Sequence, residues 1–133
     1  KKRTWGLSLA VWCWYFGTPE PYELYKSLPY TAQSPTLYKD IEYDDQELWA
    51  EVERLESENK KFSAGQNLYH VIPLFADCNI FIDNWMWDMI AEYNYVTRFN
   101  ISLGELDNVS AHRLDCFTII EKEINNCVSF KNG

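Results

Sequence analysis

The sequence has few of the residues on which most catalytic and metal sites depend. Its 133 residues include only five glycines and two histidines. It contains no glycine-rich phosphate loop, no HExxH zinc motif and no GxSxG nucleophile motif, and its four cysteines form no CxxC pair. Because the common signatures of enzymes and metal sites are missing, we predict no catalytic residue, no metal site and no cofactor.

A surplus of basic charge and a long apolar run are also lacking. Twelve lysines and arginines stand against twenty aspartates and glutamates, which gives a formal net charge of −8. A field of that sign repels nucleic acids and anionic lipids. The apolar run at residues 5–16 is too short to cross a bilayer. We therefore predict neither a nucleic-acid partner nor a membrane partner.

Aromatic residues, in contrast, are abundant. The chain has six tryptophans, nine tyrosines and seven phenylalanines, and 47% of its residues are hydrophobic. This composition is typical of a folded protein, and the length predicts a single domain over residues 1–133. Large aromatic side chains serve both cores and contact surfaces, so a core rich in large residues and an interaction surface both explain them.

The stretch at residues 80–99 has the clearest helical pattern. Its apolar residues recur at spacings of three and four, at Ile82, Met86, Met89, Tyr93 and Val96. Trp85, Ile90 and Phe99 widen this stripe, which suggests contacts on more than one side. We predict a central helix at about 78–99, with Asp77 as its N-cap.

Residues 5–16 are apolar on nearly every side of either a helix or a strand. A period of two allows a buried strand, whereas the spacing of Leu7, Ala10, Val11 and Trp14 allows a helix. A basic triplet precedes the run, as in a signal peptide, but no small-residue cleavage pattern follows it. We favour a helix within the core; the alternative is an α+β fold with a small sheet that includes residues 5–16.

Capping residues predict where the other helices begin. Asp44 opens a helix that extends to residues 60–61, Ser63 opens one at 66–72, and Ser110 opens one at 111–127. Thr18 and Pro19 predict a short helix to about residue 27, and a further short helix is expected at 102–108. Residues 29–39 are expected to form an ordered loop and residues 128–133 a loose tail. The predicted fold is all-α, a compact bundle of five or six helices.

The negative charge is concentrated in one segment. Residues 40–58 contain nine acidic residues and a single cation, Arg54, so that this segment carries the whole excess. On its predicted helix, Leu48, Val52 and Leu55 form a narrow apolar stripe. We expect Glu47, Glu51 and Glu58 to lie away from that stripe. The segment is then either an ordinary solvated helix or a negatively charged docking surface.

Two further pairs of residues could support chemistry. His112 and Cys116 lie four apart, which would suit a cysteine–histidine dyad, although a half-buried thiol beside a surface histidine is the simpler interpretation. Asp88 and Glu92 have the same spacing and could hold a hard cation, or could simply form the solvated side of a helix. We favour reduced thiols over disulfides.

A helix-turn-helix could also be drawn at 96–119, but it would present net negative charge to DNA.

Charge and aromatic content together favour a non-enzymatic, acidic protein-binding module. Such a module would occlude a basic surface of a partner protein, as phage anti-defence and toxin-immunity proteins of similar composition do. The predicted partner-binding residues are Tyr38, Tyr43, Glu47, Trp49, Glu51 and Glu58.

The sequence also allows two other functions. One is a structural or assembly subunit, for instance of a viral particle, and the other is a small-ligand-binding protein or enzyme with an aromatic-lined pocket. An oligomer is possible. We expect a cytoplasmic location, in a host cell if the protein is viral, and secretion stays open.

Overall fold

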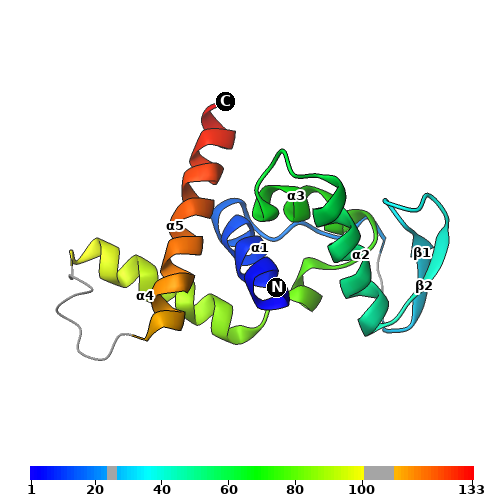
Figure 1. Cartoon of the computed structure of the whole chain (residues 1–133), viewed down its shortest axis with the longest axis horizontal. Helices are drawn as coiled ribbons and strands as arrows, with labels where there is room; N and C mark the ends of the chain where they lie inside the picture. The colour runs from blue at the N-terminus through cyan, green and yellow to red at the C-terminus, as the bar shows by residue number, and fades with distance from the viewer. Residues whose placement is uncertain (24–26, 101–109) are drawn as a thin grey trace.

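The described part of the chain folds into five α-helices and one β-hairpin. The computed structural model describes residues 1–23, 27–100 and 110–133. The elements are α1 (Lys2–Phe16), β1 (Tyr30–Gln33), β2 (Asp40–Tyr43), α2 (Asp45–Glu58), α3 (Ala64–Val71), the 3-10 helices η1 (Ile72–Leu74) and η2 (Cys78–Phe81), α4 (Asn84–Arg98) and α5 (Ala111–Asn132). The hairpin and α2 lie at one end of the molecule and α4 at the other, with α1 between them (Figure 1).

Helix α1 is the element around which the others pack. Every residue from Gly6 to Cys13 is buried, and α1 contacts α3, α4 and α5. A helix that is apolar on all sides must be covered on all sides, which explains this position. The helix predicted at residues 5–16 is confirmed. The alternative of a small sheet that includes the same residues is wrong, and so is the central place predicted for residues 78–99.

Residues 78–99 form two elements instead of one helix. The carboxylate of Asp77 accepts a hydrogen bond from the backbone N–H of Asn79 at 2.9 Å, so it caps the short helix η2. Helix α4 begins later, at Asn84, and buries Met86, Ile90 and Val96. The predicted apolar stripe therefore marks the buried face of α4. However, it covers only one side of the helix, which lies at the edge of the core.

The predicted helix starts at residues 44, 63 and 110 are confirmed. The side chains of Asp44, Ser63 and Ser110 each accept a hydrogen bond from the backbone N–H three residues further on, at 2.8, 3.3 and 3.1 Å respectively. These bonds satisfy donors that the first turn of a helix leaves unpaired.

Two local predictions are wrong, and a third falls on undescribed residues. Residues 18–23 form no helix. Helix α5 continues to Asn132 instead of ending in a loose tail, because the ring of Phe130 packs against Trp12 with 5.6 Å between centroids. The short helix predicted at 102–108 lies outside the described residues.

The hairpin is the part of the fold that departs from an all-α class. Strands β1 and β2 pair in antiparallel register, with Tyr30 opposite Tyr43 and Ala32 opposite Ile41. Tyr43 is fully buried, and the hydroxyl of Tyr30 donates to the carbonyl of Phe75 at 2.7 Å. The segment predicted as a loop therefore has one strand face on the core and the other in solvent.

Candidate functional site

A buried carboxylate joins the hairpin to α2. The side chain of Glu51 is completely buried and accepts hydrogen bonds from Ser34 Oγ at 2.6 Å, from Tyr43 Oη at 2.8 Å and from Arg54 Nη2 at 2.7 Å. The hydroxyl of Thr36 donates to the second oxygen of the same carboxylate. Both oxygens thus accept hydrogen bonds, from the hairpin and, at one of them, also from the next turn of α2.

These bonds keep the buried carboxylate ionised. Burial alone would raise the pKa of Glu51, but the hydrogen bonds from Ser34, Thr36 and Arg54 outweigh it and hold the pKa below its usual value. Burial and the bond to Glu51 raise the pKa of Tyr43, so its phenol stays protonated as a donor. The cluster therefore fixes the hairpin to α2 through charge-assisted bonds.

This arrangement corrects two of the predicted partner-binding residues. Glu51 and Tyr43 are both fully buried, so neither side chain is available to a partner in the folded protein. Glu51 lies three residues after Leu48 and four before Leu55, on the same face of α2 as that apolar stripe. The expectation that it lies away from the stripe is wrong.

The other four predicted residues lie at different places around α2. Trp49 is half-buried, with its ring edge-on to Phe81 at 5.0 Å between centroids. Glu47 is partly exposed and pairs with Arg54 at 3.1 Å. Only Tyr38 and Glu58 are open to solvent. The structure does not bring all six into one surface.

Exposed carboxylates are nevertheless spread over the hairpin and α2. We call the exposed carboxylates of residues 40–58 the acidic face; they are Asp40, Glu42, Asp44, Asp45, Glu53 and Glu58. The one cation of the segment, Arg54, is turned toward Glu47 and Glu51 and so neutralises charge within the hairpin junction. Arg54 therefore does not neutralise the carboxylates of the acidic face.

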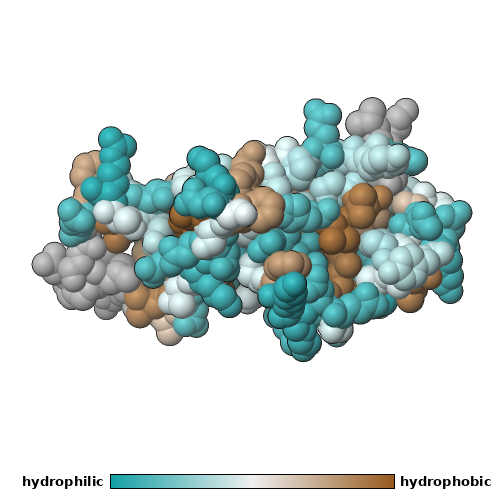
Figure 2. Space-filling model, turned by 90° about the horizontal axis from the view of Figure 1, so that it is seen from above, coloured by the Kyte–Doolittle hydropathy of each residue, from teal (hydrophilic) through white to brown (hydrophobic). Residues whose placement is uncertain are grey.

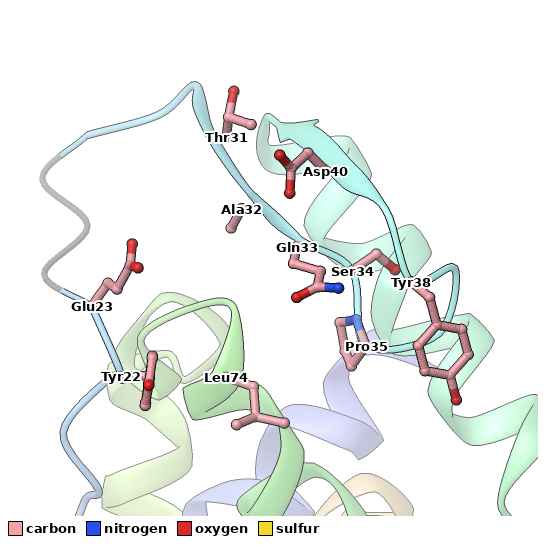
Figure 3. A pocket seen from close by; sticks show the side chains of 10 residues that line it. All are labelled: Tyr22, Glu23, Thr31, Ala32, Gln33, Ser34, Pro35, Tyr38, Asp40 and Leu74. Atoms are coloured by element: carbon pink, nitrogen blue, oxygen red, sulfur yellow. The ribbon is translucent and has the colours of Figure 1, made fainter.

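A cleft of about 610 Å³ borders the acidic face. We call it the hairpin cleft; it is lined by Tyr22, Glu23, Thr31, Ala32, Gln33, Ser34, Pro35, Tyr38, Asp40 and Leu74 (Figure 3). Its described lining includes two carboxylates and neither lysine nor arginine. The backbone N–H of Tyr22 donates to the carbonyl of Pro73 at 2.8 Å, which ties the wall opposite the hairpin to η1.

Two tyrosines at the hairpin cleft are almost fully exposed. The side chains of Tyr22 and Tyr38 are 81% and 79% accessible to solvent. Tyr38 also has a φ of +58°, a left-handed conformation that costs most L-residues about 1–2 kcal/mol. An exposed tyrosine at a position that suits glycine or asparagine contributes little to packing, and such outliers often mark functional positions.

Sequence reasoning missed most of the hairpin cleft. Thr31 and Gln33 alternate with the inward residues Tyr30 and Ala32, and this period of two was the available signal. Four residues are too few for that signal to exceed chance. The opposite wall includes Leu74, which is far from β1 in the sequence, so no local pattern could indicate it.

The histidine–cysteine pair has the predicted proximity but not the chemistry of a dyad. The sulfur of Cys116 lies 3.6 Å from Nε2 of His112. Burial raises the pKa of the Cys116 thiol, which keeps it protonated and a weak nucleophile. A cavity of about 470 Å³ lies beside the pair. All four cysteines are free and buried, as favoured from the sequence.

The described residues also contain no cluster of three or more side chains suited to a metal ion. Oε1 of Glu92, one of the predicted carboxylate pair, lies 3.2 Å from Nε of Arg113.

The described helices are not suited to spanning a membrane, and the chain has no match among the proteins with which it was compared. Within residues 1–23, 27–100 and 110–133, every helix is too short or too polar to span a bilayer. Comparison of the chain with known protein families, with curated proteins and with solved structures found no match.

Proposed function

We propose that this protein is a small acidic protein-binding module that occludes a basic surface of a partner protein. The observation that carries the proposal is the acidic face, where six carboxylates of one short segment are exposed and the segment's only cation is turned inward. The hairpin cleft, with its two exposed tyrosines, lies at the edge of that face.

Charge and aromatic rings would have different tasks in such a contact. Exposed carboxylates attract a basic partner over about 10 Å and raise the rate of association more than the final affinity. Tyrosines bury large area with few rotatable bonds, and they are enriched among the residues that dominate binding energy. Tyr22 and Tyr38 are the side chains that we assign to this role.

The buried Glu51 cluster supports this function indirectly. A binding surface formed by a free two-stranded hairpin would lose conformational entropy on association, because such a hairpin is marginally stable in water. The bonds from Ser34, Thr36 and Tyr43 to Glu51 hold the hairpin in place before any partner arrives. Glu51 is therefore a positioning residue in this proposal.

The test compares two variants that lose the same charge from different surfaces. One carries Glu42→Gln, Glu53→Gln and Glu58→Gln on the acidic face, and the other carries Asp88→Asn, Asp115→Asn and Glu121→Gln on α4 and α5. All six residues are exposed. Each protein is used to capture partners from a host lysate, and the rate and affinity of the purified partner are measured at low and high salt.

The proposal expects a basic partner whose association slows markedly only with the acidic-face variant, and whose affinity falls as salt is raised. Equal binding by both variants, or binding that salt leaves unchanged, would reject the acidic face as the site.

An assembly subunit is the second candidate function. Tyr95 on α4 and Phe99 directly after it are 59% and 58% exposed, and their rings lie tilted to each other with 4.9 Å between centroids. On the face shown in Figure 2, hydrophobic residues lie in separate patches among hydrophilic ones. A stable oligomer that persists at high salt and dissociates on Phe99→Ser would favour this candidate over the first.

A cytoplasmic location belongs to the same proposal. Four buried free thiols suit a reducing compartment, where disulfides rarely persist.

A further inference from the structure

The outer edge of β1 has unpaired backbone groups that face the hairpin cleft. The N–H of Ser34 donates to the carbonyl of Lys39 at 2.8 Å, which sets the hydrogen-bonding phase of the hairpin. With the observed register, residues 30 and 32 bond to β2, whereas Thr31 and Gln33 turn their N–H and C=O groups away from it. Four main-chain groups are thus available at this edge.

The open edge is short and has defined ends. Pro29 precedes β1 and Pro35 follows Ser34, and a proline has no N–H to contribute to a strand ladder. Across the hairpin cleft lie Tyr22 and Leu74, both exposed (Figure 3). The edge therefore resembles a slot for one extended segment of about four or five residues.

We propose that an extended basic segment of the partner binds in the hairpin cleft as a third strand, paired with the outer edge of β1. This inference rests on the proposed function and specifies how the partner is held. Main-chain bonds to Thr31 and Gln33 would supply sequence-independent affinity, and the side chains around the slot would supply the specificity.

The charges at the hairpin cleft determine which segment fits. Glu23 and Asp40 line it and are exposed, so they favour lysine or arginine on the bound strand. Leu74 and the ring of Tyr22 offer apolar contacts. Because side chains of a strand alternate between two faces, the matching segment alternates basic residues with aliphatic or aromatic ones.

The probe is a seven-residue peptide of alternating lysine and valine, acetylated and amidated at its ends. Two further peptides carry N-methyl groups on alternate backbone amides, one on the even positions and the other on the odd positions. All three have the same side chains and the same charge. Binding to the full-length protein is measured by titration at low salt.

Strand addition uses only one edge of the peptide. One methylated peptide should therefore bind about as well as the parent, while the other should lose roughly fivefold in affinity for each hydrogen bond removed. Bound peptide should also slow hydrogen exchange at the amides of Thr31 and Gln33. Equal binding by the two methylated peptides, or unchanged exchange at both amides, would overturn strand addition.

Substitutions in the protein test the role of the outer edge of β1 independently of changes in the peptide. Thr31→Pro removes an outward N–H without touching the bonds between β1 and β2, and Thr31→Val is its matched control. We expect the parent peptide to weaken only with Thr31→Pro, and unfolding curves check that both variants fold. If Thr31→Pro does not fold, the two methylated peptides still test whether the peptide binds as an added strand.

The two proposals fail in different ways. If binding depends on the carboxylates of the acidic face but is insensitive to peptide methylation, strand addition is wrong and the proposed function stands. If binding follows methylation but ignores neutralisation of Glu42, Glu53 and Glu58, the edge of β1 is the site and the acidic face is not. If the parent peptide does not bind at low salt, strand addition by a basic segment is rejected.

Discussion

The centre of this molecule around α1 and its hairpin end differ in the interactions that hold them together. Around α1, residues 6–13 are all buried and apolar packing dominates, with one buried carboxylate, Glu123, bonded to Trp12 and Ser63. At the hairpin, four polar side chains converge on the single carboxylate of Glu51. Apolar packing is non-directional, whereas hydrogen bonds to a buried charge fix the position of each partner. The bonds to Glu51 therefore fix the position of the hairpin on α2.

The largest effect is expected in the α1 region. Trp12 is fully buried, stacks near Phe16, Tyr69 and Phe130, and donates from Nε1 to Glu123 at 3.0 Å. Trp12→Ala should lower the free energy of unfolding by about 4–5 kcal/mol, because it leaves a large cavity and removes a donor from a buried carboxylate.

Urea unfolding measures this loss. Trp14→Ala, on the same helix but with 45% of its side chain exposed, is the control and should cost less than about 1.5 kcal/mol. Similar losses for the two variants would contradict the assignment of α1 as the centre of the core.

A smaller and more local effect is expected at Glu51. Glu51→Ala leaves Ser34, Tyr43 and Arg54 without their acceptor, which should cost about 3 kcal/mol. Hydrogen exchange should show the loss at the hairpin amides before it appears in α1. Glu53→Ala, two residues away and exposed, should change neither region by more than about 0.5 kcal/mol.

Lowering the pH should destabilise the hairpin before it destabilises α1. The pKa of Glu51 is lowered in the folded protein, so its stabilisation is complete above the ordinary carboxyl pKa and is lost as the pH falls through the lowered value. Hairpin amides should therefore lose protection at a higher pH than amides of α1. In Glu51→Gln this acid-dependent step should disappear, and a step of unchanged size would contradict the role assigned to Glu51.

The smallest change in stability is expected at Tyr38. Its left-handed φ of +58° suits asparagine, so Tyr38→Asn should leave the protein equally stable or stabilise it by up to about 1 kcal/mol. The same change should weaken partner binding about tenfold, because it removes an exposed aromatic anchor. Tyr38→Phe keeps the ring and serves as the control; a loss of binding there as large as in Tyr38→Asn would show that the ring is not the anchor.

The parts of this structure that the sequence predicted are those with local causes. The capping side chains of Asp44, Ser63 and Ser110 predict where helices begin, because each cap is a hydrogen bond between residues only three apart in the sequence. The central helix was misassigned because a broad stripe at 80–99 outweighed the all-round apolar character of 5–16. The latter is the stronger indication of complete burial.

The buried glutamates show where charge misled the prediction. Glu51 follows Leu48 by three residues, and Glu123 follows Ile120 by three, so spacing alone places both on buried helix faces. A carboxylate is nevertheless expected in solvent unless its donors are known. Those donors are far from Glu123 in sequence, as with Trp12 and Ser63, and helix periodicity says nothing about them.

The most direct test of the proposed function is a hydrogen-exchange footprint of the full chain, free and bound to the partner that it captures at low salt. The account predicts slowed exchange across β1 and β2 and at the exposed turns of α2, with α4 and α5 unchanged. Protection confined to α4 and α5 would contradict it, because the partner would then bind away from both the acidic face and the hairpin cleft.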